Sequence, residues 1–591
     1  MPHLAPAQDA PTIRGLTRRW RLPLPPGPLE PGLPPLSARV MSGRPQLCPG
    51  ELEPRLTGLH DPSGIPDLDK AAQTLLDAAR AGQTIAIYGD YDVDGTTGSA
   101  ILHHVLKALD PNARLLHYVP HRLTEGYGVH AHAIEALAAQ GARVVVTVDC
   151  GITAVGPARR ARELGLTLII TDHHNPPANI EDLPDAHAVV HPARPDSAYP
   201  YPDLCGAGVA FKLAWRLATL AGEGGRATAS LRSLLLDLLP LAALGTVADV
   251  SPLTGENRVL VHHGLAMARR TRVRGLAVLA QRCVREARAV HVGDLGFRLG
   301  PRINALGRVD HAGEAFELLT TSDESRIDTI CQTMDRLNAQ RQAIEKRIVD
   351  RACAEASRLG MDRDDHRAIV LAHEDWHPGV VGIACSRLVE RFGRPTILLQ
   401  RGEDLCKGSG RGIPGFNLHG AVEACRHEVV SFGGHNAAIG LAVAPERLDA
   451  FTGSLVDHAN SMLSVEDLTP ELAIDAHATL AELDEPNVAS LERLGPFGRG
   501  NPTPRLLLRS VRVPQPPTLV GAGGGHLSLF VADSSGATLR LVGWGWGRHA
   551  EKVRSGTTLD VVVTPRVEVY RGVPSVRGEI ADVRIIKKEP V

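Results

Sequence analysis

Three short apolar runs, separated by segments with helical spacing of apolar residues, constrain the fold of this chain most strongly. The runs cover residues 84–88, 143–148 and 166–171, and each one ends abruptly in a polar turn. After the first run, apolar residues recur at spacings of three and four, which is typical of a helix. Strands that alternate with helices form a parallel sheet, so the three strand ends should share one edge of that sheet.

Acidic or histidine side chains follow each of the three predicted strands. These residues are Asp90, Asp92, Asp94, Asp149, Asp172, His173 and His174. Three carboxylates at one turn repel each other, so they favour a bound cation, although the turn alone is equally compatible with a solvated acidic loop. Convergence of three strand ends favours the metal site, and mixed carboxylate and imidazole ligands suit Mn²⁺, with weaker support for Mg²⁺.

At four motifs the chain resembles the DHH phosphoesterases, and within them the branch of single-strand-specific 5′→3′ DNA exonucleases. The motifs are Gly89-Asp-Tyr-Asp-Val-Asp-Gly95, Thr147-Val-Asp-Cys-Gly-Ile152, Thr171-Asp-His-His174 and Ala243-Leu-Gly-Thr-Val-Ala-Asp249. They occur together in the order typical of the family, and the resemblance extends from about residue 50 nearly to the C-terminus. It implies a two-metal hydrolase that releases 5′-mononucleotides from single-stranded DNA in repair and recombination.

The resemblance also implies a role for each residue of the metal site. Asp92 and Asp149 would hold one ion, with Asp90 as a further ligand, and Asp149 would bridge to the second ion. The predicted ligands of that second ion are Asp94, Asp149, His173 and Asp249. His174 would face the phosphate, and Asp172 would orient a ligating histidine. The predicted catalytic residues are therefore Asp92, Asp94, Asp149, His173, His174 and Asp249, with two Mn²⁺ or Mg²⁺ ions as cofactors.

A second group of residues corresponds to substrate-binding positions of the family. They are Arg122, Arg302, Asn304, Arg308, Ser409, Arg411 and His435. By resemblance, Arg122, Ser409 and Arg411 bind the 5′-phosphate, and His435 contacts the scissile region. From the residues alone, Arg302 and Arg308 are equally compatible with solvated side chains, whereas the loop of Arg122 should overhang the strand ends, which favours a functional role for it. Each glycine-rich loop is a weak signal by itself.

The chain divides into five predicted segments, and the fold class is α/β with a C-terminal β-barrel. A long amphipathic pattern with no Pro or Gly predicts one helix from Glu324 to about Arg358. Five short β-type runs near the C-terminus suit an oligonucleotide-binding (OB) barrel, in which Trp544, Trp546, Phe530 and Tyr570 are either base-stacking or core aromatics. The predicted segments are a Pro/Arg-rich irregular arm (1–50), a parallel-sheet DHH domain (51–322), the long helix (323–360), an α/β DHH-associated domain (361–461) and the OB barrel (462–591).

Composition restricts the partners. The 64 basic and 66 acidic residues nearly cancel, so a nucleic-acid site must be a local patch or channel. Nine cysteines without a C-x-x-C pair support neither a zinc ribbon nor a disulfide framework. No signal peptide stands at Met1 and no apolar run spans a bilayer, so we expect a cytoplasmic protein with no membrane partner.

We expect a monomer that acts on single-stranded DNA with a 5′ end, with a single-stranded-DNA-binding protein and a helicase as candidate partners. One alternative is a DHH oligoribonuclease or cyclic-dinucleotide phosphodiesterase, which would share the metal site but need no barrel. The other is a non-catalytic replication scaffold on the same fold, and the intact carboxylates and the His173-His174 pair weigh against it.

Overall fold

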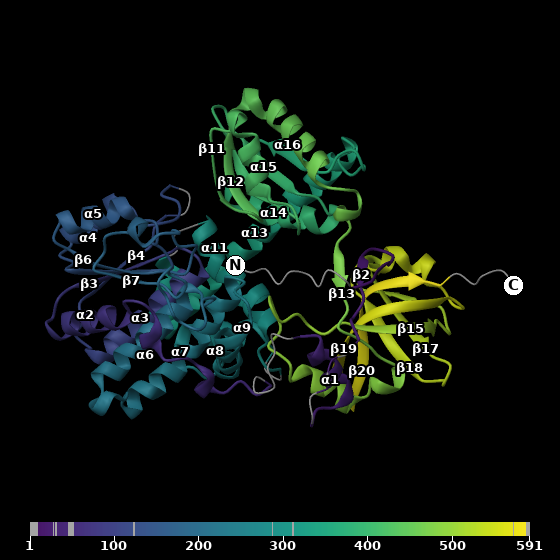
Figure 1. The fold of residues 1–591 in the computed structure, drawn as a ribbon, viewed down its shortest axis with the longest axis horizontal. Helices are drawn as coiled ribbons and strands as arrows, with labels where there is room; N and C mark the ends of the chain where they lie inside the picture. The colour runs from purple at the N-terminus through teal and green to yellow at the C-terminus, as the bar shows by residue number, and fades with distance from the viewer. Residues whose placement is uncertain are drawn as a thin grey trace. The chain divides into compact units, whose positions relative to one another are not determined.

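The structure is a computed structural model that describes residues 10–25, 27, 29, 32–44, 52–121, 124–285, 288–309, 313–570 and 573–586. The chain forms two compact units. The first unit comprises residues 50–342 and 496–502, and the second unit comprises residues 1–49, 343–495 and 503–591. The ribbon in Figure 1 is coloured along the chain and carries the element labels used below.

A five-stranded, fully parallel sheet lies at the centre of the first unit and confirms the sheet predicted from the three apolar runs. Its strand order is β4-β3-β5-β6-β7. The strands are β3 (Ile85–Gly89), β4 (Leu115–Tyr118), β5 (Val144–Val148), β6 (Thr167–Thr171) and β7 (Ala188–Val190). The side chains of β3 and β5 are buried on both faces, which explains why these strands are continuous apolar runs.

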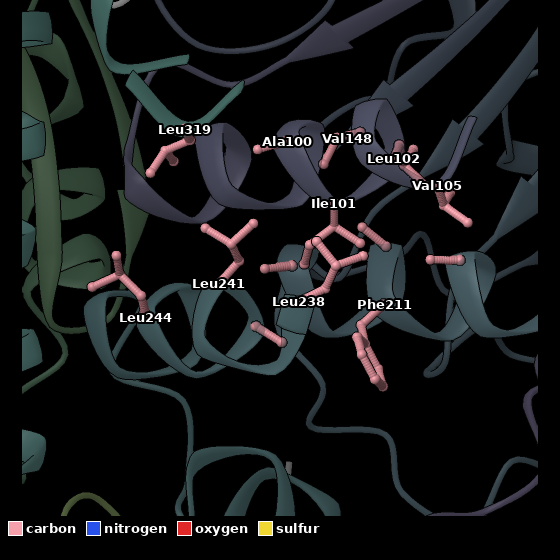
Figure 2. Packing of buried hydrophobic residues seen from close by; sticks show 14 of the residues in the cluster. Ala100, Ile101, Leu102, Val105, Val148, Phe211, Leu238, Leu241, Leu244 and Leu319 are labelled. Carbon is pink, nitrogen blue, oxygen red and sulfur yellow. The ribbon is translucent and has the colours of Figure 1, made fainter. Parts of the chain in front are cut away.

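Helices cover both faces of this sheet. One apolar cluster packs α2 (Leu68–Arg80), α3 (Val93–Leu109), α6 (Gly206–Ala221) and α7 (Ala229–Ala248) against one face. A second cluster packs α4 (Ala131–Ala139) and α5 (Val155–Glu163) against the other. Figure 2 shows the first cluster, where Ile101 of α3 lies opposite Leu238 of α7 and near Phe211 of α6. This packing fixes α3 and α6, whose N-termini carry the site described below.

Helix α7 corrects one prediction about membrane segments. Among the described residues it alone is long and apolar enough to cross a membrane, and 67% of its most apolar stretch is buried inside the protein.

The other helices of the first unit are α8 (Gly255–Met267), α9 (Arg274–Cys283), α10 (Val292–Asp294), α11 (Gly300–Val309) and α12 (Gly313–Thr320), and a π-helical turn (Leu295–Leu299) leads into α11.

One helix, α13 (Glu324–Arg358), runs over 35 residues and confirms the long helix predicted from its apolar stripe. The second unit then builds a five-stranded sheet in the order β11-β12-β10-β9-β8, in which only β8 and β9 are parallel. The strands are β8 (Ile369–His373), β9 (Thr396–Arg401), β10 (Cys406–Arg411), β11 (Ser431–His435) and β12 (Ala438–Val443). Helix α14 (Pro378–Phe392) packs on one face, and α15 (Leu418–Ala424) and α16 (Leu448–Met462) pack on the other.

The predicted C-terminal barrel is present as a sheet in the order β14-β15-β19-β20-β18-β17-β16, which an additional β15–β17 pairing closes. Its strands are β14 (Ala476–His477), β15 (Leu506–Arg512), β16 (Thr518–Val520), β17 (His526–Ala532), β18 (Thr538–Gly543), β19 (Thr558–Tyr570) and β20 (Val573–Ile585), and α17 (Glu485–Glu492) precedes β15. The five predicted runs correspond to β15, β17, β18, β19 and β20, whereas the short strands β14 and β16 were not predicted.

The N-terminal segment is more ordered than its composition predicts. A hairpin of β1 (Thr12–Arg14) and β2 (Arg19–Arg21) pairs with β13 (Glu471–Ala473), and α1 (Pro35–Ser42) follows. Trp20 is fully buried with apolar residues of the barrel, and its indole N–H donates to the buried Asp582 carboxylate at 2.7 Å. The prediction of an irregular arm is therefore wrong for the described part of this segment, because one buried aromatic side chain anchors it.

Candidate metal centre

The first acidic group owes its geometry to a tight turn between β3 and α3. Asp92 is the N-cap residue of α3, where one carboxylate oxygen accepts the N–H groups of Asp94 at 2.8 Å and Gly95 at 3.1 Å. A Cβ atom at position 95 would lie 2.6 Å from the carbonyl oxygen of Asp90, so the turn requires glycine there. The turn thus directs Asp90, Asp92 and Asp94 to the carboxyl edge of the sheet.

Asp149 follows β5 directly and occupies a left-handed backbone conformation, with φ at 66°. This conformation is uncommon for residues other than glycine and is best tolerated by Asp and Asn. The Asp149 side chain is 2% exposed. Burial and the charges of Asp94, Asp92 and Asp90 raise the pKa of this carboxyl well above its usual range. A cation between these carboxylates would relieve that repulsion.

The turn after β6 carries a histidine pair that a buried carboxylate holds in place. One oxygen of Asp172 accepts the N–H groups of His173 at 2.7 Å and His174 at 3.1 Å, and lies 2.8 Å from His174 Nδ1. Its other oxygen accepts the Ile152 N–H at 2.9 Å. Burial works against ionisation of Asp172, but hydrogen bonding and the charge of His174 outweigh it and lower its pKa to about 2. Asp172 therefore fixes the backbone of both histidines and the ring of His174, and the prediction that it orients a ligating histidine stays a prediction.

The contact between Asp172 and His174 also shifts the pKa of the histidine. Burial alone would lower the pKa of His174, but the hydrogen bond and charge of Asp172 raise it to about 9. Tyr127 also contacts this ring, with its hydroxyl 2.9 Å from Nδ1 and the ring centroids 5.0 Å apart. Tyr127 stands in a loop between β4 and α4, and no motif in the sequence pointed to it.

The three strand ends converge on one cluster of possible ligands. The groups Asp90/Asp92/Asp149, Asp94/His173/Asp249 and Asp149/His173/His174 each bring their ligand atoms within 4.8 Å of one another. Nε2 of His173 lies 2.9 Å from Oδ1 of Asp149, and both atoms are buried. Apart from this contact, neither atom makes a hydrogen bond to any described residue. Buried polar atoms require partners, and divalent ions between these oxygens and imidazoles would supply them.

Asp94 is held by the N-terminus of α6, which the sequence did not indicate. Its two carboxylate oxygens accept the N–H groups of Gly206 at 2.6 Å and Ala207 at 2.9 Å. A Cβ atom on Gly206 would lie 2.6 Å from Cβ of Asp149, and one on Gly245 would lie 2.4 Å from Oδ1 of Asp94. Burial and the charge of Asp249 raise the pKa of Asp94 to about 6. Backbone donors carry no residue signature, although the Gly206-Ala-Gly208 run before a helix was an available signal.

Asp249 occupies the C-cap position of α7 and also faces the cluster. Ser251 donates its hydroxyl hydrogen to one of the Asp249 oxygens at 2.6 Å. The segment after Asp249 is held by the loop of residues 496–502. There, the carbonyl of Arg499 accepts the Leu253 N–H at 2.7 Å, and the Arg499 guanidinium lies 3.4 Å from the Val250 carbonyl.

The predicted substrate-binding residues fall into three groups. Arg122 lies outside the described residues, and so does the side chain of Arg308 at the end of α11. Arg302 is already engaged by Asp335 of α13, at 2.7 Å, whereas no hydrogen bond of the Asn304 side chain is found within the described residues. Ser409, Arg411 and His435 lie in the second unit, on strands β10 and β11 of its sheet.

The barrel aromatics divide between core and surface. Trp546 is 8% exposed and packs against Gly543 and His549, as a core residue does. Trp544 is 54% exposed with the Arg577 guanidinium 5.8 Å from its ring, and Phe530 is 38% exposed. The side chain of Tyr570 lies outside the described residues. Only Trp544 and Phe530 of the four therefore have rings available for stacking among the described residues.

Comparison with known proteins places three family models on this chain. The DHH family N-terminal domain matches residues 84–246, the DHHA1 domain matches residues 365–460, and the RecJ OB domain matches residues 474–582. The single-stranded-DNA-specific exonuclease RecJ of Dickeya dadantii is 35% identical over 533 residues, which are 89% of this chain and 91% of that protein.

Two further relatives extend the comparison. The protein of the same name from Bacillus subtilis is 36% identical over 85% of this chain, and the match spans only 61% of that relative's length. The crystal structure of RecJ in complex with Mn²⁺ from Thermus thermophilus superimposes with a TM-score of 0.80 at 29% identity, covering 97% of this chain and 80% of that one.

Proposed function

The chain belongs to the RecJ family of the DHH phosphoesterases, and on that premise we propose that it is a metal-dependent exonuclease that degrades single-stranded DNA in the 5′→3′ direction. The observation that carries this proposal is the convergence of six carboxylate and imidazole ligands on one sheet edge. Relatives of this chain are named single-stranded-DNA-specific exonucleases, and two similar crystal structures are of RecJ from Thermus thermophilus in complex with Mn²⁺ or Mg²⁺.

We assign one ion to Asp90, Asp92 and Asp149 and the other to Asp94, His173 and Asp249, with Asp149 shared between them. Two such ions would lower the pKa of a bound water and neutralise charge at the phosphate. The protein's own contribution is to hold the ligands: α6 backbone amides fix Asp94, Ser251 fixes Asp249, and Asp172 fixes the histidine pair. His174, whose pKa Asp172 raises, is the cation placed to contact a phosphate oxygen.

We assign the direction of degradation to recognition of the 5′-terminal phosphate by Ser409 and Arg411. Arg122, predicted for the same role, lies outside the described residues. A terminal phosphate carries more charge than an internal diester, and an arginine fork can bind it through two parallel hydrogen bonds. Ser409 and Arg411 support this assignment because they stand two residues apart on β10, so both project from the same face of the sheet.

The alternatives are weaker. An oligoribonuclease or cyclic-dinucleotide phosphodiesterase of the DHH family would need no barrel, whereas residues 474–582 match the RecJ OB domain. A non-catalytic scaffold would not need the acidic and histidine ligands that are all retained here. The cytoplasmic location, the monomeric state and the partnership with a single-stranded-DNA-binding protein or a helicase stay predictions.

The decisive experiment compares single-stranded DNA labelled at its 5′ end with the same strand labelled at its 3′ end, in the presence of Mn²⁺. We expect the 5′ label to appear at once as a mononucleotide, while the 3′ label remains in long fragments until late in the reaction. A duplex of the same sequence should be resistant. Release of the 3′ label first would overturn the proposed polarity, and no release from either strand would overturn the activity.

A further inference from the structure

The sheet of the second unit carries a regular three-step pattern on one face. Each step is a row of three cross-strand partners, one each from β10, β12 and β11, and successive rows on this face are two residues apart along the strands. The three steps are Lys407–Ala442–Ser431, Ser409–Gly440–Gly433 and Arg411–Ala438–His435. Every step thus has a polar side chain on β10 and a small residue on the central strand β12, so the face forms a trough with a floor of Ala and Gly.

The trough opens into a groove at its Lys407 end. Helix α14 packs against the neighbouring part of the same face, where a Cβ atom on Gly382 would lie 3.3 Å from Ser409 Oγ. No helix covers the β12 and β11 part within the described residues, and a groove of ≈ 390 Å³ remains there. Its lining residues are Pro378, Lys407, Gly408, Ser431, Phe432, Gly433, Gly440, Leu441 and Ala442. The groove therefore begins beside Ser409 and extends away from Arg411.

The polar groups of this groove are donors without partners. Lys407 and Ser431 are exposed, and neither side chain makes a hydrogen bond or ion pair with any described residue. The side chain of Ser409 has no such partner in the described part of the chain either. No acidic residue is among the described residues that line the groove. A cation and hydroxyl groups above a floor of small residues can accommodate a compact anion, whereas the Lys407 ammonium would repel a cation.

We propose that this groove binds the outer phosphates of a 5′-triphosphorylated strand, with Lys407 and Ser431 as their ligands. The inference rests on the proposed function, in which Ser409 and Arg411 hold the 5′-terminal phosphate. Residues at alternate positions of a strand are about 7 Å apart. The two P–O–P linkages of a triphosphate span a similar distance, so an α-phosphate at Ser409 brings the γ-phosphate to Lys407.

The direction of the strand explains why the groove would serve the 5′ end. In a 5′-triphosphorylated strand the deoxyribose is attached to one side of the α-phosphate and the outer phosphates to the other, so a groove beside the anchor of the α-phosphate can hold those outer phosphates. Hydrolysis of the first diester would break its P–O3′ bond, with hydroxide from water going to phosphorus and a proton to the released 3′ oxygen. The first product would be a nucleoside 5′-triphosphate, and the shortened strand would carry an ordinary 5′-monophosphate.

The test uses one single-stranded DNA sequence with a 5′-hydroxyl, 5′-monophosphate or 5′-triphosphate end, and measures kcat/KM and the first product released. We expect the full chain to degrade the triphosphorylated strand and release one nucleoside triphosphate per strand. Lys407→Ala should lower the ratio of kcat/KM for triphosphate to that for monophosphate roughly 10- to 100-fold, the range for losing a hydrogen bond to a charged group. Lys407→Arg should retain most of the ratio, because the cation remains.

Arg401→Ala is the matched control, because Arg401 is an exposed cation of the same sheet that pairs with Cys406 and projects from the opposite face. It should leave the ratio unchanged. A wild-type protein that degrades monophosphorylated but not triphosphorylated DNA would overturn this inference and leave the proposed function standing. An unchanged ratio in Lys407→Ala would also overturn it. If the wild type degraded 5′-hydroxyl and 5′-monophosphate strands with the same kcat/KM, that result would instead contradict the proposed function.

Discussion

The metal centre of the first unit and the groove of the second unit use glycine for opposite purposes. At the metal centre, Gly206 and Gly245 let backbone and carboxylates approach so closely that an added Cβ atom would lie within 2.6 Å of a ligand residue. In the groove, Gly433 and Gly440 leave a floor over which an added Cβ would meet nothing closer than 4.0 Å. Close packing at the metal centre fixes the ligand residues, whereas the glycines of the groove leave open space above the sheet.

The polar side chains of the two sites also differ in burial. Asp94, Asp149 and Asp172 are at most 2% exposed and fully enclosed by packing, whereas Lys407 and Ser431 face solvent with no partner among the described residues. Changes in packing should therefore damage the metal centre far more than the groove. Changes in charge should alter substrate preference at the groove without affecting metal binding, and the following predictions test that contrast in order of decreasing effect.

The largest effect should come from Asp149→Ala, which removes the ligand shared by both ions. Hydrolysis should be abolished, and Mn²⁺ binding measured by titration calorimetry should fall from two ions to at most one. The protein should stay folded, because removal of a buried carboxyl whose pKa is raised by burial and neighbouring charges offsets the strain of alanine at a positive φ. Activity near that of the wild type would exclude the shared-ligand assignment.

Gly206→Ala should show that the fixed site depends on packing as well as on ligands. The new Cβ would lie 2.6 Å from Asp149 and would displace either that residue or the α6 amides that hold Asp94. Displacing such supporting contacts should lower Mn²⁺ affinity or activity roughly 10- to 100-fold. Gly156→Ala in α5 is the matched control, because nothing lies within 4 Å of its added Cβ. Equal effects of the two substitutions would contradict the proposed close packing.

Arg411→Ala should change the charge at the substrate-binding face and leave the metal centre intact. We expect kcat/KM for 5′-phosphorylated single strands to fall roughly 10- to 100-fold relative to 5′-hydroxyl strands, because a hydrogen bond to a charged group is lost. Mn²⁺ affinity should not change. The measurement is the ratio of kcat/KM on the two substrates, with Arg401→Ala as the control. A uniform loss on both would mean that Arg411 does not recognise the terminal phosphate.

Trp544→Ala should have a smaller effect, confined to binding of long strands. Its exposed ring lies near Arg577, and stacking of a base on an aromatic ring contributes roughly 1–3 kcal/mol. We therefore expect an increase of about 5-fold or more in Kd for a long single strand, measured by fluorescence anisotropy without hydrolysis. Leu519→Ala, at an exposed apolar position of the same barrel, should leave Kd unchanged. If both variants bound like the wild type, Trp544 would not contribute a stacking surface.

The smallest effect concerns stability, at a pair of buried imidazoles on α3 and β4. His103 Nδ1 lies 3.1 Å from His117 Nε2, and burial together with neighbouring charges lowers the pKa of His103 to about 4 and that of His117 to about 3. The unfolded chain binds these protons below about pH 6.5 and the folded chain does not, so stability should fall as the pH decreases from 6.5 toward 4.

At about pH 5 the loss should be on the order of 1–2 kcal/mol per histidine in the free energy of unfolding of the first unit, measured by urea titration. His117→Gln, which cannot titrate, should have a flatter stability profile between about pH 7 and pH 5 even if it is less stable throughout. A profile as steep as that of the wild type would show that other groups dominate the acid response.

The sequence was sufficient for the parts of the fold in which periodicity and burial coincide. Continuous apolar runs predicted β3, β5 and β6, and a narrow apolar stripe predicted α13 over the whole of its observed length. Convergence of the acidic and histidine residues followed from the parallel sheet, because parallel strands end at a common edge.

Other features had no residue signature and were missed. The donors to Asp94 are backbone N–H groups of Gly206 and Ala207, and the only sequence signal for them is the Gly206-Ala-Gly208 run before the helix. The trough on the second unit's sheet depends on register between β10, β12 and β11, and a row of Ala and Gly in one strand indicates nothing by itself. Trp20 falls in the segment predicted to be an irregular arm from its Pro- and Arg-rich composition, and its barrel contacts are distant in sequence.

The contact between Trp20 and Asp582 also determines when, during synthesis of the chain, the Trp20 side chain can be buried. The two residues are 562 positions apart, so the indole cannot reach its hydrogen-bond acceptor until nearly the whole protein has been synthesised. At about 5–20 residues per second, this delay lasts roughly 30 to 110 seconds. During that time the residues of the first unit can complete their own sheet, while a large apolar ring near the beginning of the chain stays unburied. The barrel therefore closes after the sheet of the first unit can form, and only then is the indole of Trp20 buried.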